Sequence, residues 1–325
     1  MAWRLRLTPE KTNIDFFRYQ WATFGGSMGL MLLAFLIWGI MGLNFGIDFQ
    51  GGTSIRTESV TAVNVAQYRK TLEAMDIGDL SITEVFDPSF RVDQHVAIIR
   101  LGAVDGKEAV TPQAIDALKA ALTAMDPAIT FVSIESVGPK VSGELIWTSI
   151  LAVAATSVGI MFYIWLRFEW QFALGGVLAL LHDVFITIGI FALFQLKFDL
   201  NIVAALLTIL GYSINDTVVV FDRLRENLVK YKTAPLRDVM NLSVNETLSR
   251  TLMTSLTTLM AVGAMLIFGG DVIRGFSFAI FMGVILGTYS SVYVAKNIVL
   301  ILGLDRGNKP KTGKGPGHEF ANVDA

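Results

Sequence analysis

The sequence contains no cysteine, few histidines and few charged residues. Because none of its 325 residues is cysteine, disulfide bonds, a thiolate nucleophile and a thiolate metal ligand are all excluded. The three histidines, His95, His182 and His318, are too few and too scattered for a convincing metal site. Charged residues make up 17% of the chain, and the net charge of -2 carries little information. We expect neither a metal nor a cofactor, and no nucleic acid as a partner.

Apolar residues are abundant and gathered into long blocks, as in membrane proteins. They account for 53% of the chain, and the mean hydropathy is +0.56. Six blocks are long enough to span a bilayer, and they cover residues 21–43, 145–166, 172–194, 200–221, 252–268 and 273–302. The last block holds one interior charge, Lys296, which lies near its end and is expected to reach the lipid headgroups. The first block is too long, and begins too far along the chain, for a cleaved signal peptide, so we expect it to be retained.

Lysine and arginine predict how the spans are oriented. Four basic residues precede the first span, and six lie in the connection 222–250 between the fourth and fifth. The connections around Lys197 and Arg274 carry one each. Since basic connections remain in the cytoplasm, residues 1–20, the 222–250 connection and a flexible tail, 305–325, are predicted to be cytoplasmic. Residues 44–140 must then lie outside, and 141–304 contain the five remaining spans.

The outer region, 44–140, has the pattern of a small folded domain. Residues 53–58, 81–86, 95–101 and 129–137 have the composition of strands, and residues 62–75 and 112–125 have helical spacing. The resulting order, β-α-β-β-α-β, is the split pattern of ferredoxin-like folds. The sequence therefore predicts a bundle of six transmembrane helices with a small ferredoxin-like α+β domain in the periplasm.

Asp216 is the most unusual residue of the spans, because it lies within the fourth apolar block. An ionisable side chain at this depth is costly and marks a functional candidate. Arg250, at the start of the fifth span, is the obvious cation, and hydroxyl residues follow it at Thr251, Thr254, Ser255, Thr257 and Thr258. A proton could therefore be exchanged at Asp216 with modest changes around it. A static Asp216–Arg250 pair that only holds two helices together is the alternative.

His182 and Asp183 form a second polar pair, midway along the third span. They could belong to the same proton route, because histidine titrates near neutral pH, or His182 could simply be a neutral, hydrogen-bonded residue of the interior. Ser213 and His182 could also form the dyad of an intramembrane serine hydrolase. No glycine-rich turn follows Ser213 to expose a nucleophile, so we do not expect an enzyme.

A glycine-rich junction, FGIDFQGGT at residues 45–53, follows the first span. Gly51 and Gly52 permit backbone conformations closed to other residues, Gly46 adds further freedom, and Asp48 can cap a turn, so a rigid exit from the membrane is expected. Glycines four residues apart, in pairs at 25 and 29 and at 283 and 287, could each mark a close helix contact.

Three stretches together carry a family resemblance. They are the junction, GYSINDTVVVFDRLREN at 211–227, and NETLSRT at 245–251 continuing into SLTTL at 255–259. With these motifs the chain resembles the SecF family, the smaller subunits of bacterial SecDF complexes, within the resistance-nodulation-division superfamily. The resemblance covers nearly the whole chain.

The resemblance implies a role in protein export at the bacterial inner membrane. Members of the family pair with SecD to complete a twelve-helix unit. The complex works beside the SecYEG translocon and SecA, and is thought to pull unfolded preprotein outward with the proton motive force. The aspartate of the Ile214-Asn215-Asp216 motif and the arginine matching Arg250 are linked to proton conduction. A related exporter of small molecules or lipids is the competing interpretation.

Overall fold

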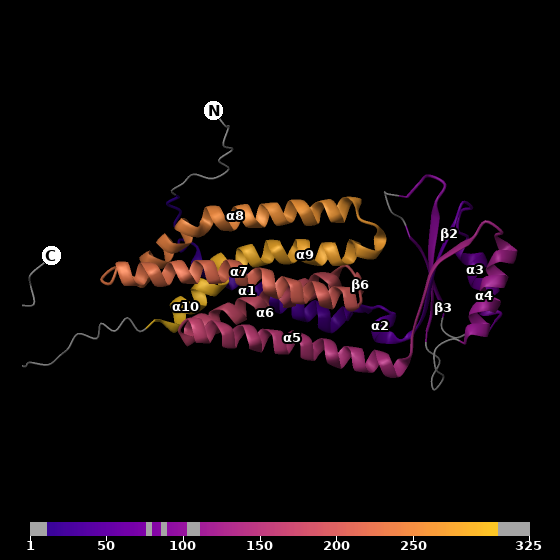
Figure 1. Ribbon diagram of the computed structural model, residues 1–325, viewed down its shortest axis with the longest axis horizontal. Coiled ribbons are helices and arrows are strands. Elements are labelled where there is room, and N and C mark those ends of the chain that lie inside the picture. The colour runs from indigo at the N-terminus through magenta and orange to yellow at the C-terminus, as the bar shows by residue number, and fades with distance from the viewer. Residues whose placement is uncertain (1–11, 76–79, 86–89, 103–110, 305–325) are drawn as a thin grey trace, which may run out of the picture.

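The apolar blocks fold into long helices that lie side by side, and a smaller α/β unit stands at one end of them, as the computed structural model in Figure 1 shows. The structure describes residues 12–75, 80–85, 90–102 and 111–304. The predicted tail, residues 305–325, lies outside these ranges, as do residues 1–11 with three of the four N-terminal basic residues, and residue 86 at the end of a predicted strand.

Six helical segments are long and apolar enough to cross a membrane, counted over the described ranges. They are α1 (Gln20–Met41), α5 (Pro139–Arg167), α6 (Trp170–Leu193), α7 (Leu200–Lys230), α8 (Leu236–Phe268) and a sixth segment of three parts, α9 (Asp271–Ser290), η1 (Ser291–Ala295) and α10 (Lys296–Leu302). The six spans predicted from the sequence are confirmed. The middle part of the sixth, η1, is a π-helical turn, which local hydropathy could not reveal.

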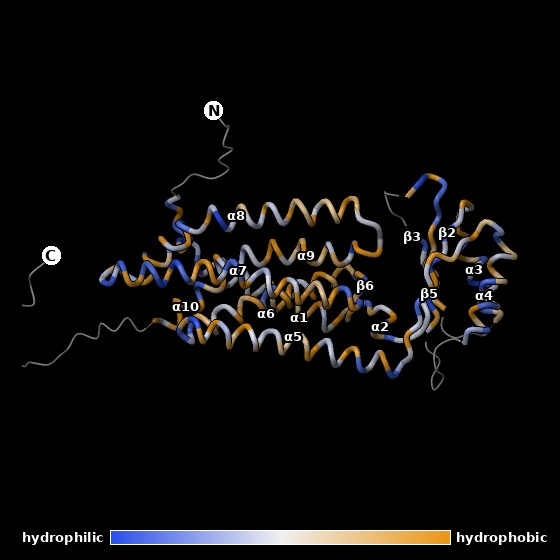
Figure 2. The backbone as a smooth tube through the Cα atoms, in the orientation of Figure 1, coloured by the Kyte–Doolittle hydropathy of each residue, from blue (hydrophilic) through white to orange (hydrophobic). Residues whose placement is uncertain are grey.

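The connection between the fourth and fifth spans is mostly helical. Helix α7 continues to Lys230 and α8 begins at Leu236, so only residues 231–235 of the predicted 222–250 connection are not helical. The last turns of α7 and the first turns of α8 are polar, and they form the hydrophilic end of the bundle in Figure 2. This end lies opposite the one that carries the α/β domain. The bundle therefore projects two paired helices beyond its apolar part.

The α/β domain, residues 52–137, has the predicted ferredoxin-like order. Its elements are β2 (Gly52–Ser59), α3 (Val65–Glu73), β3 (Leu80–Val85), β4 (His95–Leu101), α4 (Pro112–Met125) and β5 (Thr130–Val137). The strands form one antiparallel sheet in the order β3-β4-β2-β5. The first and third strands of the domain are therefore central, as in a split β-α-β unit, and the predicted fold class is confirmed.

One face of this sheet is covered by α3 and α4, which lie on the side away from the bundle (Figure 1). Ile55 and Ile99 of the central strands pack on Leu72 of α3 and on Leu118 and Leu122 of α4, and all five side chains are fully buried. Burial of this kind contributes roughly 1.5–3 kcal/mol per side chain, so the domain has an apolar core of its own.

Glycines set the closest approach between helices of the bundle. Gly283 and Gly287 of α9 face α7, where a Cβ added at Gly283 would collide with Ile209 and one added at Gly287 would lie 3.0 Å from the Ser213 Cβ. This pair marks a close helix contact, as small residues do in membranes. A Cβ added at residue 25 or 29 would meet no atom of another described element within 4 Å, so this pair marks no close helix contact within the described part of the chain.

Candidate functional site

Asp183 is the centre of a polar cluster in the middle of the bundle. Its side chain is fully buried on α6 and accepts hydrogen bonds at Oδ2 from Ser213 of α7 and Ser290 of α9, both at 2.7 Å. The Nδ1 atom of His182 lies 3.0 Å from Oδ1. Three helices thus direct polar groups at one carboxyl, which satisfies most of its hydrogen-bonding capacity in a region without bulk solvent.

His182 is also buried, and only one of its ring nitrogens is used. Nδ1 faces Asp183, whereas Nε2 has no hydrogen-bond partner among the described residues. A histidine with one nitrogen on a carboxyl and the other open is able to pass a proton between two sides of its ring. The arrangement is compatible with the proton route predicted for this pair.

Asp216 is buried as well, but it is held more loosely than Asp183. Its Oδ2 atom accepts a 3.5 Å contact from the Ser255 hydroxyl of α8, and its side chain is 3% exposed. Ser255 in turn lies 2.7 Å from Thr288 Oγ1 of α9 and 3.5 Å from the Tyr212 hydroxyl. The predicted hydroxyl-rich helix thus supplies two hydroxyls to this carboxyl, Ser255 through a long bond and its neighbour Thr254.

The two carboxyl clusters lie on one stripe of α7. Ser213, which donates to Asp183, and Asp216 are three residues apart, and side chains at this spacing are neighbours on a helix surface. Thr288 and Ser290 of α9 belong to the Asp216 and the Asp183 cluster respectively. Polar groups therefore follow one another along the α7–α9 contact, where the glycines bring the two helices together.

Arg250 is not in direct contact with Asp216. Within the described part of the chain no ion pair joins them, and Arg250 is exposed on α8. It is close enough to act on the carboxyl electrostatically. The structure therefore lacks the static Asp216–Arg250 ion pair that was the alternative prediction. The two residues interact only over a longer distance. Asn215 is exposed and does not point into either cluster's buried interior.

Ser213 is engaged by the carboxyl rather than by the histidine. Its hydroxyl donates to Asp183, and His182 directs Nδ1 to the other oxygen of the same carboxyl. A serine nucleophile needs its hydroxyl bonded to the base that activates it. The geometry does not form the Ser213–His182 dyad of a hydrolase. The described residues also contain no group of three or more His, Cys, Asp and Glu side chains that could hold a metal ion.

Lys296 does not reach the headgroups, so that prediction is wrong. Its side chain is 1% exposed, and its Nζ atom lies 4.0 Å from the centre of the Phe17 ring and donates to the Phe16 carbonyl at 3.3 Å. The Phe16 and Tyr293 rings complete an aromatic cage around the ammonium group. The physical reason is that residues 12–19 cover this end of the bundle, which the local sequence around Lys296 cannot show.

Asparagines of α8 hold this covering segment in place. Asn245 accepts a bond from the Ile14 amide at 2.8 Å and donates to the Ile14 carbonyl at 2.9 Å, while Asn241 accepts from the Phe16 amide at 2.9 Å. These bonds satisfy backbone groups that no helix or sheet would pair. The segment before the first span is consequently part of the fold.

The glycine junction joins the first span to the third and fourth. Strand β1 (Asn44–Phe45) pairs in parallel with β6 (Lys197–Phe198), and the short helix α2 (Ile47–Gln50) follows. Asp48 accepts a bond from the Leu200 amide at 2.9 Å and so caps the start of α7. The Gly46 amide donates to the Phe198 carbonyl at 2.8 Å.

Gly51 and Gly52 turn the chain from this junction into β2. Their φ angles of +75° and +112° are ones that other residues rarely adopt. A Cβ at Gly51 would also lie 3.3 Å from the Pro139 Cα, at the start of α5. The junction therefore fixes the entry to the α/β domain beside the exit from it.

The sequence did not predict that Ser290, Thr288 and Tyr212 would belong to the polar clusters. Each lies in an apolar span where a hydroxyl commonly bonds its own backbone, as Thr288 also does to Val284. A recognisable signal is present in retrospect, because hydroxyl residues 288–291 interrupt the sixth span at the depth of the π-helical turn.

Two family models match the chain. A model described as "Protein export membrane protein SecD/SecF, C-terminal" matches residues 117–305, and one described as "SecD/SecF GG Motif" matches residues 36–63. The second match contains the glycine junction. The first contains all of the residues of both polar clusters.

Relatives and solved structures resemble the chain over most of its length. The protein translocase subunit SecF of Cereibacter sphaeroides is 69% identical over the whole of both chains, and that of Rhodobacter capsulatus is 64% identical over 98% of this chain and 97% of the relative. The crystal structure of SecDF from Thermus thermophilus, a translocon-associated membrane protein, is 35% identical with a TM-score of 0.80 over 91% of this chain. The chain spans 39% of the length of that SecDF chain.

Proposed function

The chain belongs to the SecD/SecF family of protein export membrane proteins, and from this premise we propose that it is the SecF-type part of an accessory complex that uses the proton motive force to promote export of preproteins through the Sec translocon. The observation that carries the proposal is the pair of buried carboxyls on adjacent helices. The α/β domain at one end supplies a unit that such a bundle could move.

Asp216 is the residue at which we propose that protons bind and leave. It is buried, and its partners are the hydroxyls of Ser255, at 3.5 Å, and Thr254. Since a hydroxyl can donate or accept a hydrogen bond, gaining a proton breaks little of its surroundings. Arg250 favours the ionised form from a distance. One charge moved through 100 mV corresponds to roughly 2.3 kcal/mol, which is enough to change the balance between two conformations by more than tenfold.

The Asp183 cluster is proposed as the part of the same route that lies nearer the outer face of the membrane. Ser213 of α7 is three residues from Asp216 and donates to Asp183 of α6, where His182 offers an open nitrogen. Hydrogen-bonded hydroxyls and imidazoles are suited to passing protons through a bundle. Asp183 keeps three partners, so it serves to position the serines, whereas Asp216 changes its charge.

A SecD-type partner is proposed to complete the route. The chain matches only part of a solved SecDF chain. In the most apolar stretch of α8, only 17% of the residues are buried within this subunit. The hydroxyl residues of α8 that do not meet Asp216 are therefore available to a second set of helices. In this proposal SecYEG, SecA and the unfolded preprotein are further partners, and the preprotein is engaged by the outer α/β domain.

The orientation in the bacterial inner membrane follows the basic residues. We propose that both termini and the paired extensions of α7 and α8 are cytoplasmic, with the α/β domain outside. Because the chain has no cysteine, Lys232→Cys and Val92→Cys can each be labelled singly in intact cells. A membrane-impermeant maleimide should modify position 92 and leave position 232 unmodified until the membrane is opened. Labelling of position 232 in intact cells would refute the orientation.

Asp216→Asn is the direct test of the proton site. The variant keeps the shape of the side chain but cannot ionise, so it should leave the complex assembled and abolish proton-driven stimulation of export. The measurement is translocation of a preprotein into inverted membrane vesicles, with and without an ionophore that dissipates the gradient. Arg250→Lys, which keeps the charge but loses the planar fork, should be partly impaired.

Asp222→Asn is the matched control, because Asp222 is a carboxyl of the same helix that lies near its end and pairs with Arg167. It should export at the parental rate. If Asp216→Asn, in an assembled complex, retained export that the ionophore abolished, Asp216 would be structural and the proposed mechanism wrong.

A further inference from the structure

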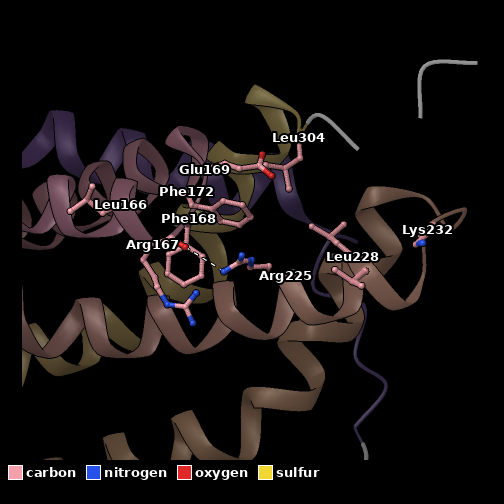
Figure 3. A pocket seen from close by; sticks show the side chains of 10 residues that line it. Leu166, Arg167, Phe168, Glu169, Phe172, Arg225, Leu228, Lys232 and Leu304 are labelled. Atoms are coloured by element: carbon pink, nitrogen blue, oxygen red, sulfur yellow. Dashed lines mark hydrogen bonds between the residues drawn. The ribbon is translucent and has the colours of Figure 1, made fainter. Parts of the chain in front are cut away.

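A pocket at the hydrophilic end of the bundle has no part in the carboxyl clusters. It lies between the turn that joins α5 to α6 and the last turns of α7, with a volume of about 510 Å³ (Figure 3). Its walls are formed by Leu166, Arg167, Phe168, Glu169, Phe172, Arg225, Leu228, Val229, Lys232 and Leu304. This volume is within the range of sites that bind small organic molecules.

The position of the pocket is that of a membrane surface. The α5–α6 turn comes directly after one apolar span and before the next, and Trp165 and Trp170 on either side of it are 57% and 53% exposed. Exposed tryptophans gather where the hydrocarbon meets the headgroups. Phe168, Phe172 and Leu228 form the apolar part of the wall, so the pocket offers both an apolar and a polar side at this depth.

The polar side of the pocket is basic. Arg167, Arg225 and Lys232 line it, against one acidic residue, Glu169. Arg167 is largely engaged, because its guanidinium lies 3.5 Å from Asp222 Oδ1 and over the Phe168 ring. Arg225 donates only to the Arg167 carbonyl, at 3.4 Å, as the dashed line in Figure 3 shows.

Two of these cations therefore lack an acidic partner. Across the described ranges, no carboxylate lies within ion-pair distance of Arg225 or Lys232. A cation at the rim of an apolar pocket is stabilised by an anion that fits the same place. Guanidinium groups bind phosphate through two parallel hydrogen bonds, and a lysine adds a mobile point charge.

We propose that this pocket binds an anionic phospholipid of the adjacent leaflet, with its phosphate at Arg225, the positive charge of Lys232 at the rim, and the upper part of an acyl chain along Phe168, Phe172 and Leu228. A free phosphate would use the cations but not the apolar wall, and a zwitterionic lipid would leave the positive charge uncompensated. The lipid would join the α5–α6 turn to the end of α7. This site is independent of the proton route proposed above.

The test uses the full-length chain, purified, stripped of lipid and then mixed with phosphatidylglycerol or phosphatidylcholine of the same acyl chains. Native mass spectrometry measures the fraction of protein that retains one lipid. Phosphatidylglycerol should be retained at least several-fold better. Since the attraction of one basic residue for an anionic lipid corresponds to about fivefold in affinity, Arg225→Gln and Lys232→Gln should each weaken it by about that factor.

Lys230→Gln is the matched control, because Lys230 lies on the same helix end but outside the pocket wall. It should leave retention unchanged. Equal retention of the two lipids, equal loss in Lys230→Gln, or displacement by millimolar glycerol phosphate would overturn the proposal. So would a requirement to remove residues 305–325 before any lipid binds, because the chain's own tail would then be the occupant.

Discussion

The α/β domain and the helical bundle bury different kinds of side chains. The core of the domain is aliphatic, and none of its described charged side chains is buried. Its titratable core residue is Tyr68, whose pKa is raised by burial and further by the nearby Asp126 carboxylate, so it is uncharged near neutral pH. The interior of the bundle instead contains Asp183, Asp216 and Lys296.

This difference shows that acidic and basic side chains are buried in the bundle and not in the described part of the α/β domain. Removing a charge from water costs several kcal/mol unless partners compensate, and a domain that only has to fold avoids that cost. The bundle buries an ionisable side chain at three places, and the contacts that compensate it differ from one place to the next. Asp183 has three hydrogen-bond partners at 3.0 Å or less, and Lys296 has a cage of rings and one carbonyl. Asp216 has a long bond from Ser255 and the hydroxyl of Thr254. The least compensated of the three is the one proposed to change charge.

The largest expected effect on stability is in the apolar core. Leu118→Ala should lower the free energy of unfolding of the α/β domain by about 2–5 kcal/mol, because it leaves a cavity among fully buried aliphatic side chains. A fragment of residues 52–137 should give a cooperative melt with mixed helix and strand circular dichroism, in which this loss can be measured. Val132→Ala, at an exposed position, should cost less than about 0.5 kcal/mol. A disordered fragment would show that the domain depends on the bundle.

Asp183→Asn should have a smaller effect on stability. An amide oxygen at the position of Oδ2 still accepts both serine bonds, and the amide nitrogen replaces the oxygen that faces His182. Polar contacts between membrane helices are each worth roughly 0.6–2 kcal/mol, so a total loss of about 1–2 kcal/mol is expected in a detergent unfolding titration. Ser157→Ala removes a buried hydroxyl that bonds only its own helix and should change stability by no more than about 0.5 kcal/mol. A loss above about 4 kcal/mol for Asp183→Asn would make the cluster primarily a structural element.

Lys296→Met should have the smallest effect of the three. Methionine fills a similar volume and contacts aromatic rings favourably, while the cost of burying the ammonium group disappears. The gain and the loss should nearly cancel, within about 1 kcal/mol by the same titration. If the variant lost several kcal/mol, the cation itself would be needed to hold residues 12–19 over the end of the bundle.

The sequence predicted what depends on local periodicity. Six apolar blocks and the alternation of residues 53–58 and 95–101 were sufficient for the spans and for the order of the domain, because each pattern is complete within one element. Asp216 stood out for the same reason, since a single charge in an apolar block needs no knowledge of its neighbours.

Features that depend on contacts distant in sequence could not be predicted in this way. The Phe16 carbonyl meets Lys296 across 280 positions, and Ser290 meets Asp183 across 107. Nothing near Lys296 indicates that another segment covers it. The separation of Arg250 from Asp216 depends on the rotation of α8 about its axis, which hydropathy does not determine.

The attachment of the α/β domain has a mechanical consequence. The chain enters the domain through Gly51 into β2 and leaves it from β5 into α5, and these two strands are hydrogen-bonded neighbours. Gly51, at the entry, and Pro139, at the exit, lie against each other. Both connections between the bundle and the domain therefore reach the sheet at one place, which can act as a pivot (Figure 1). Any rotation of the domain relative to the bundle must take place about that pivot. A small tilt of α5 would then be magnified in proportion to the distance from it, as at the far end of a lever.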